Sequence, residues 1–175
     1  MPRNIEIKAR LGSGSALAEV AVRAAVFATE GPHEISQDDT FFRCDSGRLK
    51  LRAFADGHGE LIYYRRADAA GPKESFYTIA PVEDPDALRR ALTLALGAIG
   101  RVRKQRTLYL VGRTRVHLDR VESLGEFLEL EVVLRDDETA EVGEAEARVL
   151  MGELGIAPAQ LVEGAYLDLL EAATD

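Results

Sequence analysis

The chain has a single cysteine, no tryptophan and no long apolar run. Among its 175 residues only Cys44 carries a thiol, so no internal disulfide can form, and a reducing, cytoplasmic location is expected. Its longest apolar stretches, such as residues 91–99, are far shorter than the roughly 20 residues of a membrane span. No basic segment followed by an apolar one opens the sequence, so we expect neither a signal peptide nor a membrane partner.

An excess of positive charge is also lacking. The 22 Lys and Arg residues are outnumbered by 30 Asp and Glu residues, which gives a formal net charge of −8 and a pI near 5.0. A general nucleic-acid binder carries a basic field, so a nucleic-acid polymer is not an expected partner. The length and the 46% hydrophobic content predict one domain over residues 1–175 with a substantial core. Whether it is a monomer or a homodimer stays open.

Hydrophobic periodicity predicts about eight short strands interrupted by about four helices. Polar and apolar residues alternate in the expected strands, which are residues 4–11, 35–44, 48–54, 60–66, 74–79, 102–111, 114–121 and 126–134. Apolar residues recur at helical spacing in the expected helices, which begin after Ser15 and at Pro85 or Asp86 and cover residues 137–154 and 161–172. Gly31-Pro32 is expected to close the first helix. The pattern is that of an α+β domain.

Charged residues occupy one face of several expected strands at a strict two-residue spacing. Lys50 and Arg52 alternate with leucines, and so do Glu129 and Glu131. A solvated outer face would explain any one of these strands. However, the opposite faces are strongly apolar and the chain supplies amphipathic helices to cover them, so we expect the sheet to curl with its charged faces inward. Dry, unpaired charges in such a lumen would be very costly, which favours a wet lumen that holds an ionic ligand.

Basic residues outnumber acidic ones on these faces. The cationic candidates are Lys8, Lys50, Arg52, Arg66, Lys73, Lys104, Arg106 and Arg115. The acidic candidates are Glu6, Asp119, Glu129 and Glu131. Excess cations in an acidic chain favour a small, highly anionic ligand, and polyphosphate is the natural candidate. Clustered carboxylates beside such cations favour Mg²⁺ or Mn²⁺.

Seven segments, in sequence order, resemble the CYTH superfamily, the triphosphate tunnel metalloenzymes that include class IV adenylyl cyclases and thiamine triphosphatases. The first strand of that family carries Glu-x-Glu-x-Lys, and here it reads Asn4-Ile5-Glu6-Ile7-Lys8. The other segments are DTFF (39–42), GRLKLR (47–52), LIYYRR (61–66), GPK (71–73), VRKQR (102–106) and FLELEV (127–132). Together they extend over nearly the whole chain.

The resemblance implies an eight-stranded antiparallel β tunnel, a barrel with a charged lumen that helices cover from outside. It implies that the eight cationic candidates contact phosphates. It also implies that Glu6, Glu129 and Glu131 are ligands of Mg²⁺ or Mn²⁺, with Asp119 as a helper. Asn4 stands where the signature has its first glutamate. An amide oxygen can ligate Mg²⁺ but adds no charge, so one metal site would be weakened or lost.

The implied function is that of a metal-dependent enzyme acting on ATP or another triphosphate. It would either convert ATP to cyclic AMP and pyrophosphate, or hydrolyse an organic or inorganic triphosphate. One alternative is a polyphosphate- or nucleotide-binding module whose catalysis has weakened, which the Asn4 substitution makes plausible. Another is a structural sheet with solvated charges, which would bind no triphosphate.

Two further features are weighed against structural roles. His117 shares a strand face with Arg115 and Asp119, so it is either a phosphate contact or proton shuttle, or a structural residue. Asp38-Asp39 reads as part of a solvated surface.

Overall fold

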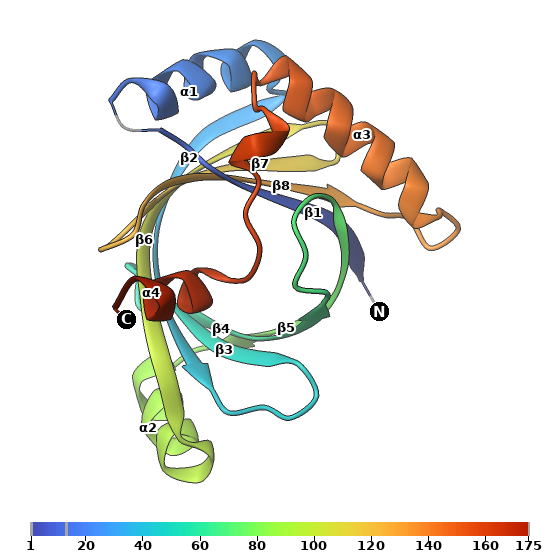
Figure 1. The fold of residues 1–175 in the computed structure, drawn as a ribbon. Helices are drawn as coiled ribbons and strands as arrows, with labels where there is room; N and C mark the ends of the chain where they lie inside the picture. The colour runs from blue at the N-terminus through green and yellow to red at the C-terminus, as the bar shows by residue number, and fades with distance from the viewer. Residues whose placement is uncertain (1, 13, 175) are drawn as a thin grey trace.

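The computed structural model describes residues 2–12 and 14–174, and its strands close into a barrel (Figure 1). The strands are β1 (Arg3–Arg10), β2 (Glu30–Phe42), β3 (Arg48–Phe54), β4 (Gly59–Arg66), β5 (Lys73–Val82), β6 (Ala98–Val111), β7 (Thr114–Val121) and β8 (Gly125–Val133). The helices are α1 (Ala16–Phe27), α2 (Pro85–Leu96), α3 (Ala140–Glu153) and α4 (Tyr166–Thr174), with a short 3₁₀ helix, η1 (Pro158–Gln160). The strand order around the barrel is β1-β5-β4-β3-β2-β6-β7-β8, with every neighbouring pair antiparallel. The expected α+β class and eight-stranded antiparallel barrel are confirmed.

The two-residue period of the strands separates an ionic interior from an apolar exterior. In β1, Glu6 and Lys8 line the barrel lumen, whereas Ile5 and Ile7 point the other way into the main apolar core. All four side chains are buried. Each strand can therefore be buried on both faces, because polar groups meet polar groups inside and apolar groups meet helices outside.

Two helices cover the outer face of one half of the barrel. Figure 1 shows α1 and α3 lying side by side over β1, β7 and β8, and the main apolar core fills the space between them. Gly143 lets α3 approach the sheet closely, because a Cβ at that position would lie 2.6 Å from Cγ1 of Ile5 and 2.7 Å from Cδ2 of Leu134. In contrast, α2 lies beside β2 and β3 with only Pro85 buried. In the part of the chain that the structure describes, no helix has the length and apolar character needed to cross a bilayer.

Several expected element boundaries are wrong. β2 begins at Glu30 rather than at Ile35, and β6 begins at Ala98 rather than at Val102. Gly31-Pro32 does not close the first helix, because α1 ends at Phe27 and the pair lies inside β2, at a register irregularity against β6. Gly31 has a φ of 104°, and a Cβ there would lie 2.6 Å from the Leu108 carbonyl oxygen, so the close strand pairing requires glycine.

The last helix begins at Tyr166 rather than at Leu161. The preceding segment, residues 161–165, is extended: Leu161 bridges to Ala9, and the Val162 amide donates to the Lys8 carbonyl at 3.0 Å. In Figure 1 the segment between η1 and α4 crosses the opening of the barrel. Strand pairing at the barrel end therefore overrides the local helical pattern, and the chain covers one end of the lumen.

Candidate active site in the barrel lumen

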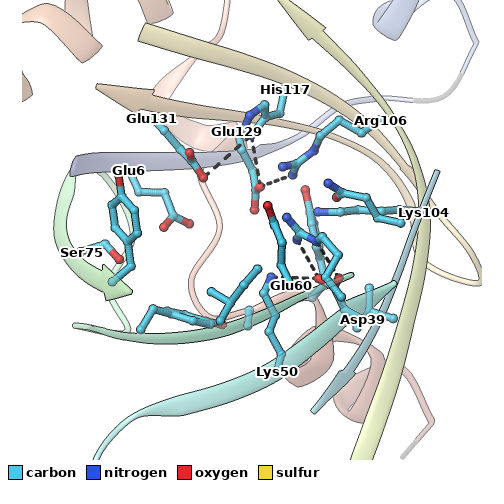
Figure 2. Close-up of a pocket in the computed structure, with 18 of the residues that line it drawn as sticks. Glu6, Asp39, Lys50, Glu60, Ser75, Lys104, Arg106, His117, Glu129 and Glu131 are labelled. Carbon is cyan, nitrogen blue, oxygen red and sulfur yellow. Dashed lines mark hydrogen bonds and ion pairs between the residues drawn. The ribbon is translucent and has the colours of Figure 1, made fainter. Parts of the chain in front are cut away.

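The lumen is a cavity of about 350 Å³ to which all eight strands contribute side chains. Fourteen residues are predicted from the sequence as site candidates. Twelve of them line the cavity: Asn4, Glu6, Lys8, Lys50, Arg52, Arg66, Lys104, Arg106, Arg115, His117, Glu129 and Glu131. The other two, Lys73 and Asp119, are buried beside it. Figure 2 shows the labelled charged side chains pointing toward the centre of the barrel from opposite walls. The sheet therefore curls as expected, with its charged faces turned inward.

Asp119 joins two of the basic side chains. Its carboxylate accepts hydrogen bonds from Lys104 at 3.0 Å and from Arg106 at 2.6 and 2.7 Å, and it is fully buried. The hydroxyl of Tyr166 donates a further bond to it at 2.9 Å. Three of these bonds reach Oδ2 and one reaches Oδ1, so the carboxylate holds two cations and a hydroxyl in place, which fits a role in positioning cations. Burial alone would lower the pKa of Arg106, but Asp119 and Glu129 outweigh it and hold that pKa well above its usual value.

Asp39 plays the same part for two cations on β3, which corrects the expectation of a solvated Asp38-Asp39 pair. Its oxygens accept bonds of 2.8 Å from Lys50 and, twice, from Arg52, and the residue is 2% exposed. Asp38 points outward and pairs with Arg101 at the surface. Adjacent residues of a strand face opposite sides, so only one of the two could be solvated.

The pKa values in this cluster follow from burial and from neighbouring charge. Burial would raise the pKa of Asp39, but Arg52 and Lys50 outweigh it and hold that pKa well below its usual range. For Lys50, burial and the nearby Arg52 lower the pKa to about 8, although Asp39 opposes the shift. With a pKa of about 8, Lys50 loses its charge only slightly above neutral pH.

At the covered end of the lumen, basic side chains bind the C-terminal segment. Lys8 and Arg66 both donate to the carbonyl oxygen of Gly164, at 3.0 and 3.1 Å. Arg66 also forms an ion pair with Glu6. The ring of Tyr166 lies 4.1 Å from the Lys8 ammonium and packs edge-on against Phe127. Tyr166 could not be predicted as a lumen residue, because nothing in a local helical pattern indicates that the first residue of the helix enters a barrel.

The uncovered end of the lumen is less polar. The lumen-facing residues of β2 run from Ile35 to Phe41, and Phe41 belongs to the same apolar cluster as Tyr166, so Ile35 marks the opposite end. Phe54 and Ile79 line the cavity as well, and the Ile79 side chain is 46% exposed. An ionic interior thus continues into an apolar rim.

A cluster of possible metal ligands lies where β7 and β8 meet. His117 faces Glu129 in the strand register, and one ligand atom from each of His117, Glu129 and Glu131 lies within 4.8 Å of the others. Arg106 binds Glu129 at 2.7 Å, and Arg115 binds Glu131 at 2.8 Å. Burial would raise the pKa of Glu131, but His117, Arg115 and Arg106 lower it to about 2, so this carboxylate is ionised and able to bind a cation.

Buried polar atoms without a hydrogen-bond partner indicate that the lumen suits an ionic ligand. Among the described residues, four buried side-chain atoms have no hydrogen-bond partner: Asn4 Oδ1, Gln37 Oε1, Arg66 Nε and His117 Nδ1. Their four residues all line the cavity. Such groups are costly to bury unless a ligand, ion or water completes them. Oxygen and nitrogen acceptors next to ionised carboxylates are a donor set that suits a divalent cation.

Two acidic residues of the lumen were absent from the sequence-based set. Asp39 and Glu60 bring the buried or lining carboxylates to six, against eight basic side chains. Most cations are therefore matched by a carboxylate inside the barrel. Strand alternation could have placed Glu60 on the face of Arg66, whereas the partners of Asp39 depend on a register that local sequence does not encode.

The fold and the lumen define a β-tunnel protein with an ionic interior that is covered at one end. The sequence matches the family model of the CYTH domain over residues 2–166, so the chain belongs to the CYTH family. No curated protein matches the sequence.

Solved structures share the fold at low sequence identity. The PH1012 protein of Pyrococcus horikoshii superposes with a TM-score of 0.83 at 22% identity, covering 95% of this chain and 99% of that one. A putative adenylate cyclase of Vibrio parahaemolyticus gives 0.72 at 17% identity, covering 96% and 97%. A putative adenylyl cyclase of Hippeastrum, described as having a dominant triphosphatase activity, gives 0.67 at 18% identity, covering 97% and 96%.

Proposed function

We propose that this protein is a metal-dependent enzyme that acts on a triphosphate held in the barrel lumen. The observation that carries the proposal is the ring of eight basic side chains that six strands direct inward, at or beside one cavity. Buried ion pairs contribute little net stability compared with well-packed apolar residues of the same volume. Such a dense set of them is therefore better explained by a polyanionic ligand than by folding.

The basic residues bind and orient the phosphates. Arg52 and Arg106 each direct at least two guanidinium nitrogens into the lumen, where they now meet Asp39 and Asp119. The same forked geometry fits two phosphate oxygens. Because Tyr166 and the segment before it cover one end, the triphosphate enters from the other end. An organic substituent then lies against the apolar rim.

Phosphoryl transfer requires mainly positioning and charge neutralisation. In hydrolysis, a water oxygen bonds to the terminal phosphorus, the bridging P–O bond breaks, and a diphosphate leaves while the proton passes to solvent. In cyclisation, the ribose 3′-hydroxyl attacks the α-phosphorus, loses its proton, and pyrophosphate leaves. The lysines and arginines hold the phosphorus in line in either case, so the depth at which the triphosphate lies decides between the two reactions.

The residues that would hold a divalent ion, Mg²⁺ or Mn²⁺, are Glu6, Glu129 and Glu131. When bound, the ion would neutralise charge on the phosphate oxygens. Arg115 and Arg106 keep the two β8 carboxylates oriented by the bonds described above. The chain itself thus provides ionised oxygen ligands and the groups that fix their direction.

A binding module with weakened catalysis is the second candidate. It is favoured by Asn4, whose buried Oδ1 lines the cavity without a partner and adds no negative charge. With one charge fewer, the ion would be held less tightly. The module would bind triphosphate without releasing product.

Phosphorus NMR tests the proposal directly. The protein is incubated with ATP, thiamine triphosphate or tripolyphosphate, each with Mg²⁺ or with Mn²⁺. Terminal phosphate release identifies a triphosphatase, and pyrophosphate with a cyclic product identifies a cyclase. Thermal stabilisation by triphosphate without product supports the module. No product and no stabilisation would refute both candidates, because ligand at 100-fold over Kd adds about 2.7 kcal/mol.

Variants link any turnover to the lumen. Arg106→Ala and Glu131→Gln should each lower the turnover rate by a factor equivalent to about 2–4 kcal/mol, since each removes a preorganised charge. Arg103→Ala is the matched control, because Arg103 lies on the same strand with its side chain 52% exposed on the outer face. If Arg106→Ala and Glu131→Gln both keep the wild-type rate on every substrate, the assignment of the site is wrong.

A further inference from the structure

His117 is a buried histidine whose imidazole nitrogen has no partner. The residue is 4% exposed, and its Nδ1 forms no hydrogen bond within the described residues. The nearest carboxylate oxygens are Oε2 of Glu129 and Oε1 of Glu131, each 3.9 Å from Nδ1. Figure 2 shows the imidazole at the top of the lumen, directed toward these two side chains. Both separations are ion-pair distances, drawn as dashed lines in Figure 2, but neither is a hydrogen bond, so the buried nitrogen still requires an explanation.

The spacing fits one ion between the three residues. A separation of 3.9 Å is too long for a hydrogen bond. Two ligand atoms bound to one ion at about 2.1 Å can lie up to about 4.2 Å apart, so both oxygen–nitrogen pairs are within reach of a shared ion. The full set spans at most 4.8 Å, which a shift of less than an ångström would close.

The neighbours of the two carboxylates leave room for such an ion. Arg115 binds Oε2 of Glu131, which leaves Oε1, the oxygen nearest to His117, without a bond to that arginine. Arg106 donates to Oε2 of Glu129, the oxygen nearest to His117, and Lys8 lies 3.3 Å from Oε1, so an ion would use the second lone pair of Oε2. Such outer partners orient metal ligands. They also carry positive charge, so the affinity of the site for an ion is expected to be modest without a bound polyanion.

We propose that His117, Glu129 and Glu131 form a mixed imidazole–carboxylate site that selects a transition ion, Mn²⁺ or Co²⁺, over Mg²⁺. Mg²⁺ prefers oxygen ligands alone and retains its waters, whereas imidazole nitrogen binds first-row transition ions with increasing strength from Mn²⁺ to Co²⁺. The inference deepens the proposed function and rests on it in one respect, since Glu129 and Glu131 are metal candidates in both. The histidine decides which ion is chosen.

Calorimetric titration of the chelator-treated, triphosphate-free protein with MnCl₂, CoCl₂ and MgCl₂ tests this selectivity. Wild type should bind Mn²⁺ and Co²⁺ at least about tenfold more tightly than Mg²⁺. His117→Asn, which puts an amide where Nδ1 lies, should lower that ratio toward one. His58→Gln is the control for adventitious binding, because His58 has a side chain 73% exposed beside Asp56, and it should leave the ratio unchanged.

Pulsed EPR of the Mn²⁺-loaded wild type gives a second readout that does not depend on a variant folding. Coupling to an imidazole nitrogen is expected, and it should persist in His58→Gln. Equal affinities for the three ions, no detectable binding, or a Mn²⁺ signal without nitrogen coupling would each overturn the proposal. Turnover is not measured in these experiments. Mn²⁺ binding through His117 in a protein that processes no triphosphate would refute the proposed function and leave this inference standing.

Discussion

Replacing Asp39 by asparagine separates the two tasks of the lumen cations, which are to stabilise the fold and to bind a polyanion. In the wild-type protein the Asp39 carboxylate accepts three bonds of 2.8 Å from Lys50 and Arg52. Asp39→Asn keeps the shape of the side chain but removes the carboxylate with which two buried cations form their ion pairs. Breaking a buried ion pair by removing one partner costs about 3–5 kcal/mol. The unfolding temperature should fall by about 6–20 °C, at about 2–4 °C per kcal/mol for a chain of this size.

Tripolyphosphate should reverse part of this loss. Its oxygens can replace the missing carboxylate for Lys50 and Arg52, so a saturating concentration should raise the unfolding temperature of Asp39→Asn by more than that of wild type. Differential scanning calorimetry with and without the ligand measures both effects.

The pH dependence of stability tests the role of Asp39 independently. The pKa of Asp39 is lower in the folded than in the unfolded protein. Its contribution to stability is therefore complete above about pH 4 and is lost as the pH falls below that value. Asp39→Asn should lack this component of acid destabilisation.

Asp38→Asn is the matched control, because Asp38 is the next residue of the same strand and pairs with Arg101 at the surface. An exposed pair of this kind contributes about 0–1 kcal/mol. Equal, small effects of the two substitutions would refute the view that Asp39 neutralises buried cations. A large loss that tripolyphosphate does not repair would refute the assignment of Lys50 and Arg52 as phosphate contacts.

Two further predictions concern the approach of a helix and the charge of a lysine. Gly143→Ala should destabilise the protein by about 1–3 kcal/mol in urea, because its Cβ would overlap Ile5 and Leu134. Gly152 lies in the same helix, but a Cβ at that position would have no atom within 4 Å, so Gly152→Ala should instead stabilise the protein by about 0.5–1 kcal/mol. Equal effects of the two substitutions would contradict the packing argument. Affinity for tripolyphosphate, measured without metal, should fall as the pH rises above about 8, because free Lys50 then loses its proton and its attraction for phosphate. Lys50→Arg should flatten this dependence, and an unchanged slope would show that Lys50 does not bind the phosphates.

The strands and the inward direction of the charged faces could be predicted from the sequence because both depend on local alternation. The spacing of Lys50 and Arg52, and of Glu129 and Glu131, places each pair on one face whichever strands lie alongside. The matching apolar faces then require cover from helices. These are properties of single segments, and the resemblance to the CYTH superfamily places them in one order along the chain.

The partners of the charged residues could not be predicted, because they depend on contacts between distant segments. Glu6 meets Arg66, 60 positions away, and Lys8 meets the carbonyl of Gly164, 156 positions away. Local sequence does not show which of two adjacent aspartates, Asp38 or Asp39, turns inward, since that depends on the pairing of β2 with β3.

The sequence by itself determined the fold class, the family and the residue types that face the lumen, because each follows from periodicity or from motifs in order. The tertiary structure alone decided that Asp39 and Asp119 neutralise cations, that Tyr166 covers one end, and that His117 faces two glutamates. Strand register and barrel closure bring these groups together, and both are set by the packing of the whole chain rather than by any one segment.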